Sequence, residues 1–444
     1  MPKAEKKQKA KNNEPTAATA QRKENQCSYF VESKRRFCPF LLSKSGNSLF
    51  CPQHSTENQA DRAQCAWCKT SVFAKDLNSH TQRCNLRPTA PPSYFEKDVN
   101  IMRPSRPVEP ATHIRDLSPS NLATLFEKIR ASHTSLPSLV SINYHTPSTY
   151  PIKPDPTNTN PEQITTSKHK LQINSLLSRL STLSLLSPSN TYVEMGCGTA
   201  EFSHHVNETV STSNEKPLFV LVDRGVSRWK VKMDRGRFVK IKIDIKDFAL
   251  DKCLEEQDGG DGKVTPVVCI SKHLCGGATD LTLRCLEQYV SKGEGRSLKG
   301  ILIALCCHHR CTFESYVNPE FFTEKLGFTS NEFSHLCYLS SWGAVKESIS
   351  CLDDKATRSE SKGEEEEDHG CALDETDNSA DGLGGHFSGL NVDERRMLGR
   401  QVKDLFNAGR VEYLKQTLNF KNVYVEAYCD VSVTPENMVL MCSQ

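Results

Sequence analysis

The sequence predicts a mixed α/β fold in which helices cover both faces of a mostly parallel sheet, preceded by two small modules rich in cysteine and histidine. From about residue 167, apolar runs of strand length alternate with stretches of helical apolar spacing, which is the pattern of βαβ units. Between residues 26 and 87, cysteines and histidines recur at close spacings while aliphatic residues are few. The 444 residues suffice for two or three domains.

Composition argues against several classes of protein. No apolar run is long enough for a transmembrane helix, and the charged start of the chain lacks the apolar segment of a signal peptide. We therefore expect the nineteen cysteines to be metal ligands, site residues or buried thiols in a reducing compartment, the nucleus or the cytoplasm. We also expect a monomer with no membrane partner.

The net charge of +2 hides an uneven distribution along the chain. Residues 353–381 hold twelve acidic residues against three basic ones, so the rest of the chain is distinctly basic. A basic body favours a polyanionic partner such as a nucleic acid. An ordinary solvated surface explains the excess equally well.

Changes in composition divide the chain into parts. The predicted parts are a disordered basic tail (1–25), a first Cys/His module (26–58), a second Cys/His module (59–87), a Pro/Ser-rich linker with one helix (88–166) and an α/β domain (167–444) with an acidic disordered insertion (353–390). The linker helix is indicated at 120–133 by apolar residues at helical spacing, Leu122, Leu125, Phe126 and Ile129.

Apolar spacing also sets the order of elements in the α/β domain. The expected order is a helix (168–186), a strand and loop (191–198), a helix (201–210), strands (217–224, 237–245 and 266–273), a helix (278–290) and a strand (299–307). Two closing strands, 423–431 and 437–442, should form an antiparallel hairpin joined by a short turn.

The Cys/His modules have the ligand spacing of zinc sites. The first reads C-x10-C-x12-C-x2-H and the second C-x2-C-x11-H-x3-C. The predicted ligands are Cys27, Cys38, Cys51 and His54 in the first module, and Cys65, Cys68, His80 and Cys84 in the second. Zinc takes four such ligands in a tetrahedron and can supply the folding energy of a module without a core. The alternative, free buried thiols, lacks a core in which to bury them.

A glycine-rich loop after the first strand indicates a cofactor site. VEMGCGTAEFS (193–203) contains Gly-x-Gly, but Glu201 stands where a dinucleotide fold usually has a third glycine. An acidic residue before the glycines suits a cationic, amino-acid-bearing ligand, and S-adenosylmethionine (SAM) fits. The predicted SAM residues are Glu194, Gly196, Cys197 and Gly198, with Asp223 for the ribose and Asp244 and Ile245 for adenine. Each aspartate could instead cap a helix.

Two further strand ends carry many titratable side chains. The segments 270–285 and 305–311 leave adjacent strands at their carboxyl ends, where open α/β sheets place their chemistry. We expect the following residues to cluster there: Lys272, His273, Cys275, Asp280, Cys306, Cys307, His308, His309 and Cys311.

These segments carry a family resemblance. SKHLCGGATD and ALCCHHRC, with VEMGCG, the two zinc modules, Lys168-His169, Ser341-Trp342-Gly343, LGRQVKDLFNAGRVEYL (398–414) and TPEN (434–437), resemble the eukaryotic tRNA 2′-O-methyltransferases that modify position 4 of the acceptor stem. The resemblance implies a Rossmann-like class I SAM-dependent methyltransferase domain, two structural zinc ions and a tRNA acceptor stem as partner. The terminal hairpin is typical of such domains.

The chain departs from this family's pattern in two places. The second zinc module usually reads Cys–His–His–Cys in the family, but Ser71 stands at the second ligand position and Cys68 would substitute. The acidic insertion is longer than is typical. A broader methyltransferase-like group shares the Cys/His motifs without acting on tRNA, so the tRNA assignment depends on the zinc modules, Lys272 and the C-terminal segments.

Methyl transfer to a ribose 2′-OH needs a base, or a cation that stabilises the developing oxyanion. The candidate catalytic residues are His273, Lys272, Cys306, His309 and Arg310, with Arg310 and Arg410 as phosphate contacts. The blander alternatives are a phosphate contact for Lys272 and a structural role for His273.

The Cys/His stretch of 305–311 leaves two interpretations open, because it could face the substrate or hold a third metal together with Cys275. Two rival functions also remain. They are a methyltransferase of another RNA or of a protein, and a non-catalytic zinc protein that binds RNA.

Overall fold

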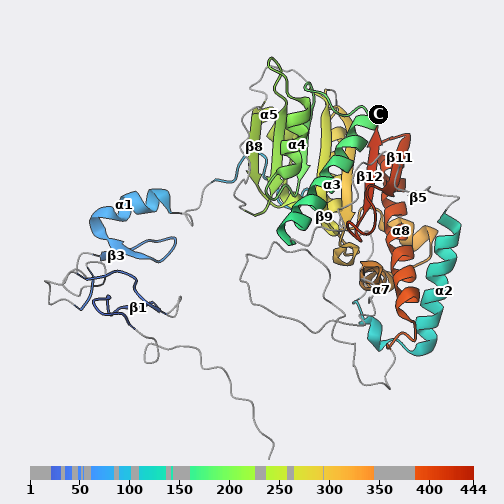
Figure 1. The fold of residues 1–444 in the computed structure, drawn as a ribbon, viewed down its shortest axis with the longest axis horizontal. Coiled ribbons are helices and arrows are strands. Elements are labelled where there is room, and N and C mark those ends of the chain that lie inside the picture. The colour runs from blue at the N-terminus through green and yellow to red at the C-terminus, as the bar shows by residue number, and fades with distance from the viewer. Residues whose placement is uncertain are drawn as a thin grey trace, which may run out of the picture. The chain divides into compact units, whose positions relative to one another are not determined.

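The computed structural model describes residues 22–31, 36–42, 49–51, 54, 62–84, 90–101, 110–136, 142–143, 161–225, 237–257, 265–293, 295–344 and 386–444. The chain divides into two compact units, residues 1–91 and 92–444 (Figure 1). The basic tail and the acidic insertion predicted at 353–390 lie almost entirely outside the described residues.

The first unit holds two short hairpins and one helix. In its first part, β1 (Phe30–Val31) pairs with β2 (Arg36–Phe37) in antiparallel fashion. In its second part, β3 (Arg62–Gln64) pairs with β4 (Ser71–Phe73), and α1 (Ala74–Arg83) follows directly. None of the residues of α1 is buried, so apolar packing contributes little to holding this helix in place.

An eight-stranded sheet forms the centre of the second unit. Its order is β5 (Ile142–Asn143), β11 (Asn422–Ala427), β12 (Met438–Ser443), β10 (Leu298–Cys306), β9 (Val267–Cys275), β6 (Thr191–Met195), β7 (Leu218–Asp223) and β8 (Arg237–Lys242). The strands from β10 to β8 run parallel, and β12 is antiparallel to both of its neighbours. The structure is therefore mixed α/β with a large, mostly parallel sheet.

Helices cover both faces of this sheet, as the sequence predicts (Figure 1). The strands are buried on both sides, so successive residues such as Tyr192 and Val193 belong to different cores. One core receives α3 (Pro161–Thr182) and α4 (Glu201–Val210). The other receives α2 (Pro119–Ser135), α5 (Leu250–Gln257), α6 (Gly277–Ser291), α7 (Ser330–Ser340) and α8 (Val392–Thr417).

The stretch predicted as linker, 88–166, contains structured parts of the second unit. Its helix α2 buries the four predicted apolar residues in the core beside α8. Residues 94–100 pack along 245–249, where the buried Asn100 side chain donates to the carbonyls of Ile245 and Phe248 at 2.6 and 2.8 Å. The sequence predicts the helix and leaves open whether it docks separately or belongs to the α/β domain, and the structure places it in the second unit. The pairing of residues 94–100 was not predicted, because Pro and Ser content does not reveal a segment ordered by distant backbone partners.

The closing strands form the predicted antiparallel pair, but a longer loop connects them. Residues 428–437 leave the sheet between β11 and β12 and pack under α3, where Ser175 donates to the carbonyl of Tyr428. Arg179 of the same helix donates to the carbonyl of Ala427 at 3.1 Å. No helix among the described residues is long and apolar enough to cross a membrane.

Candidate functional site

The structure brings the four predicted ligands of the first module together. Donor atoms of Cys27, Cys38, Cys51 and His54 all lie within 4.8 Å of one another. His54 Nδ1 is 3.4 Å from Cys27 Sγ and 3.3 Å from Cys51 Sγ. The three cysteines are buried and form the centre of the module's small core, with Leu42 and Phe50 beside them. This donor set fits zinc, which would supply the folding energy that so small a core lacks.

The second module gathers its ligands on a hairpin and a helix. Cys65 and Cys68 lie on the turn after β3, His80 lies on α1, and Cys84 ends that helix. Cys68 Sγ is 3.2 Å from His80 Nε2, and hydrogen bonds with Thr70 and His80 lower the pKa of Cys68 to about 6. A thiol of this kind readily becomes the thiolate that zinc requires. Cys68 therefore lies where the module needs its second ligand. The family's spacing would place that ligand at residue 71, which is a serine in this chain.

The glycine loop between β6 and α4 leaves room for a ligand. Gly196 and Gly198 have φ of +69° and +47°, which favours glycine at both positions. A Cβ on Gly196 would meet Leu274 at 2.9 Å, whereas a Cβ on Gly198 would meet nothing within 4 Å. Cys197 between them is buried, and burial raises the pKa of its thiol to about 12. Gly198 thus presents an open backbone position that a cofactor can approach closely.

Acidic side chains flank this loop on two sides. Asp223 ends β7, and its carboxylate accepts hydrogen bonds from the backbone N–H of Gly198 at 2.8 Å and of Gly225 at 2.7 Å. Glu194 is fully buried in β6 and accepts from the N–H of Ser203 at 3.2 Å. Burial raises the pKa of Glu194 to about 7. A cationic ligand beside Glu194 would favour its carboxylate form.

Asp244 and Ile245 lie after β8, as predicted, in a short helical turn (Ile245–Asp247). The Asp244 side chain caps this turn by accepting from the N–H of Lys246 at 3.1 Å, which is the capping role that the sequence left open. Ile245 is buried.

Lys272 and His273 lie near the carboxyl end of β9 and face helix α3. Lys272 Nζ lies 3.1 Å from His169 Nδ1, and His273 Nε2 lies 3.3 Å from Gln172 Oε1. Burial lowers the pKa of Lys272, which favours its neutral amine. His273 has φ of +59°, a conformation that L-residues other than glycine adopt rarely and that often marks a functional position. Both side chains are thus held by partners rather than left to solvent.

His169 and Gln172 belong to the site through these contacts, although the sequence pattern does not predict it. The Lys168-His169 pair contributed to the resemblance, but neither His169 nor Gln172 was given a role. The buried Gln172 lies among apolar residues of α3, and a polar residue on the apolar face of a helix is the signal that could have identified it.

Three of the predicted cysteines meet at the carboxyl ends of β9 and β10. Cys275 Sγ and Cys306 Sγ are 3.3 Å apart, and Cys307 Sγ lies within 4.8 Å of both. Cys306 and Cys307 are buried, and Cys275 is half-buried. Hydrogen bonds from the other two thiols lower the pKa of Cys275 well below its usual range.

The remaining predicted residues divide between the surface and a buried network. His309 is half-buried, and burial lowers its pKa. Arg310 is exposed, and its backbone packs against Gly276, where a Cβ would be 2.7 Å from Arg310 Cβ and 2.8 Å from the carbonyl oxygen of Cys307. This close approach requires a glycine, so Gly276 serves packing between the two strand-end loops.

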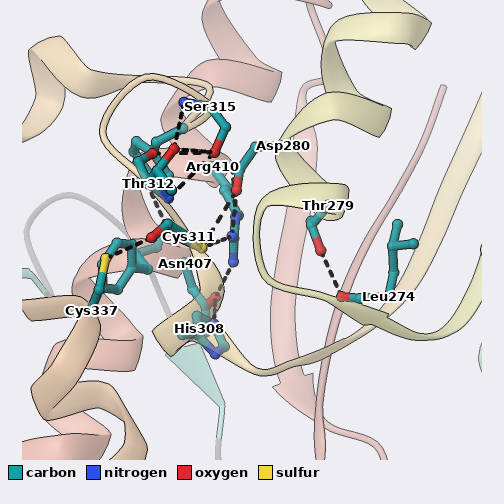
Figure 2. A network of polar contacts seen from close by, with 12 residues as sticks. Leu274, Thr279, Asp280, His308, Cys311, Thr312, Ser315, Cys337, Asn407 and Arg410 are labelled. Carbon is teal, nitrogen blue, oxygen red and sulfur yellow. Dashed lines mark hydrogen bonds and ion pairs between the residues drawn. The ribbon is translucent and has the colours of Figure 1, made fainter. Parts of the chain in front are cut away.

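Asp280, His308 and Cys311 do not reach the site, because they turn inward to α8 (Figure 2). Arg410 donates to both carboxylate oxygens of Asp280, at 3.0 and 2.8 Å, and lies 3.2 Å from Cys311 Sγ. His308 Nε2 lies 2.8 Å from Asn407 Oδ1. Arg410 is 1% exposed, so the expectation that it holds phosphates is wrong. Its charge is matched inside the protein, where it joins α6, α8 and the loop after β10.

Two family models match this chain. A family model described as "Methyltransferase TRM13" matches residues 171–443, and one described as "CCCH zinc finger in TRM13 protein" matches residues 25–55. The chain belongs to the TRM13 methyltransferase family. The first TRM13 match covers the whole sheet except β5, and the second covers the four donors of the first module.

Curated members of the TRM13 family match along almost the whole chain. The human and mouse proteins named "tRNA:m(4)X modification enzyme TRM13 homolog" are 31% and 30% identical, each over 94% of this chain and 94% of their own length. The Saccharomyces cerevisiae "tRNA:m(4)X modification enzyme TRM13" is 27% identical over 97% of this chain and 98% of its own. No solved structure matches the chain significantly.

Proposed function

We propose that this member of the TRM13 family is a SAM-dependent tRNA methyltransferase that modifies the ribose 2′-OH of nucleotide 4 in the acceptor stem. The observation that carries the proposal is the match, over 94% to 97% of this chain, to enzymes named "tRNA:m(4)X modification enzyme". The geometry of the second unit is consistent with it, since the open glycine loop follows the carboxyl end of β6 and the Lys272–His273 pair lies near the carboxyl end of the neighbouring parallel strand β9.

We further propose that the second unit is a Rossmann-like class I methyltransferase domain. Two features of the sheet support this assignment. Chain order reverses between β6 and β9, because β6 leads to β7 and β8 on one side while β9 and β10 follow on the other. Ligands of open α/β sheets bind at such a switch point, outside the carboxyl ends of the strands. The antiparallel β12 beside β10 is the second feature.

The residues around the glycine loop fit SAM. Gly198 offers its open backbone, Asp223 ends the next strand with a carboxylate that could accept from ribose hydroxyls, and the buried Glu194 suits a cationic group. Asp244 and Ile245 remain our choice for the adenine side. SAM supplies an electrophilic methyl group when it is bound.

Lys272 is our proposed base. Burial favours its neutral amine, and His169 Nδ1 can accept one amine N–H, which leaves the lone pair free for the proton of a 2′-OH. The Nε2–H of His273 can donate to Gln172, which fixes the orientation of the His273 ring beside Lys272. His309 and the exposed Arg310 are candidate contacts to the RNA backbone on the neighbouring strand end.

We propose that the two zinc modules bind the tRNA. Tyr29, Phe40 and Trp67 are exposed by 47%, 54% and 42%, and Arg36 and Arg83 are exposed in the same unit. Exposed aromatic and basic side chains together favour single-stranded or terminal nucleotides by stacking and charge. The ring of Tyr29 is held in place, because it stacks on the ring of His54 with 3.9 Å between the ring centroids.

The test is to incubate the purified protein with methyl-labelled SAM and total tRNA and to map the label by nuclease digestion and mass spectrometry. We expect label on the ribose of nucleotide 4. Label on a base would refute the ribose mechanism. SAM binding without tRNA label would favour another RNA or a protein as substrate, and absence of SAM-dependent thermal stabilisation would favour a non-catalytic RNA-binding protein.

A further inference from the structure

The cluster of Cys275, Cys306 and Cys307 has no role in the proposed methyl transfer. O-methylation of a hydroxyl needs no thiol nucleophile, and two of these thiols are buried. Other buried cysteines, such as Cys253 and Cys269, serve as single small apolar residues of the core. Among the described residues, the structure forms a group of three or more metal-type donors in three places, and the other two are the zinc modules.

The spacing of these thiols matches that of the zinc modules. Cys275 Sγ and Cys306 Sγ are 3.3 Å apart, and the Cys–His donor distances in the modules are 3.2 to 3.4 Å. Two sulfur ligands at zinc–sulfur bonds of about 2.3 Å in a tetrahedron lie about 3.8 Å apart. The thiols of the third cluster are therefore close enough to hold zinc after an outward shift of about half an ångström.

The backbone is shaped to bring the third sulfur into the cluster. Cys275 and Cys306 are register partners on adjacent parallel strands, which brings their side chains together. Cys307 has φ of +50° and ψ of 44°, a left-handed conformation that L-residues other than glycine adopt rarely. Gly276 allows this turn in two ways. Its N–H donates to the carbonyl of Cys306 at 3.1 Å, and the absence of a Cβ avoids a clash with the carbonyl oxygen of Cys307.

We propose that Cys275, Cys306 and Cys307 bind a thiophilic metal ion, Zn²⁺, through three sulfur ligands with a fourth position open. A disulfide would use only two of the three thiols, whereas a metal ion uses all three. Cys311, which lies in the same Cys/His stretch, is excluded as a ligand because its sulfur faces Asp280 and Arg410. The ion would join the carboxyl ends of β9 and β10 two residues from His273. This proposal does not depend on the identity of the methylated substrate.

Metal content tests the proposal on the full chain purified without chelator. We expect inductively coupled plasma mass spectrometry to find three zinc ions per wild-type chain and two per chain of the Cys275→Ser/Cys306→Ser double variant. The matched control is Cys253→Ala, which removes a buried core thiol outside the three groups and should keep all three ions. Two ions in the wild type, or a third ion that survives in the double variant, would overturn the proposal.

Thiol protection in the wild type gives a second readout that no folding defect of a variant can affect. Cys275 is half-buried, so without a metal it should react with iodoacetamide in the native protein. We expect it to be protected until a zinc chelator is added, while Cys253 stays protected throughout. Alkylation of Cys275 before chelation, or a peptide in which Cys275 and Cys306 are joined by a disulfide, would contradict a metal site.

Discussion

Lys272 can act either as a base or as a cation, and two substitutions at this residue separate the roles. Lys272→Arg keeps a positive charge but cannot serve as a base at neutral pH, and Lys272→Met removes both. If Lys272 is the base, both variants should lose about 100-fold or more in kcat, the usual contribution of general acid–base catalysis. Single-turnover kinetics with labelled SAM measures this loss, and substantial turnover by Lys272→Arg would instead assign the cationic role.

The pH profile supplies the control for this interpretation. Because burial lowers the pKa of Lys272, the active amine should form at lower pH than in an ordinary lysine. The wild-type kcat/KM should therefore rise with pH and level off below the range in which free lysine titrates.

His273→Asn tests the role of the neighbouring histidine, because asparagine tolerates the left-handed backbone at this position. It should lower turnover while leaving SAM affinity within about tenfold, since His273 fixes geometry at the strand end.

Glu194 makes stability depend on pH in the unusual direction for a carboxylate. Its pKa is raised to about 7 in the folded chain, above the value of an exposed glutamate, so the folded state holds the proton more tightly. Its contribution to stability is fully present at pH below the unfolded pKa and is lost as pH rises towards 7 and beyond. Compared with the wild type, Glu194→Gln should gain about 2 to 3 kcal/mol in unfolding free energy between pH 5 and 8. Urea unfolding at both pH values measures this, and a constant difference between the two proteins would contradict the assignment.

At the scale of elements, the Asp280–Arg410 pair fastens α6 to α8 inside the second unit. The side chains are 0% and 1% exposed, so breaking the pair leaves an uncompensated buried charge. Asp280→Asn and Arg410→Met should each cost about 3 to 5 kcal/mol of unfolding free energy. The double variant should cost clearly less than the sum, because neither charge then remains. Denaturant titration of the four proteins gives the cycle, and additive losses would show that the pair does not act as a unit.

The elements that the sequence predicts well are those whose pattern is local. The α4 helix has the predicted bounds, and β7 and β10 fall within two residues of theirs, because apolar periodicity sets each of them within its own segment. The Cys/His donors of the two modules were predicted in the same way, from spacing alone, and the structure brings them together. Arg410 was misjudged because its partner Asp280 lies 130 residues earlier, and no local pattern shows that a basic residue is matched in the interior.

At the scale of the whole molecule, the two units should separate binding from chemistry. The first unit depends on its Cys/His clusters for order, whereas the second has large apolar cores on both faces of its sheet. Cys27→Ser/Cys51→Ser should therefore unfold the first module while leaving the melting transition of the second unit and its SAM affinity unchanged. If the modules bind tRNA, the KM of this variant for tRNA should rise about tenfold or more while kcat stays nearly unchanged. The reason is that the lost contacts stabilise the bound substrate and the transition state equally. A fall in kcat at unchanged KM would instead place the zinc modules in the chemistry of the second unit.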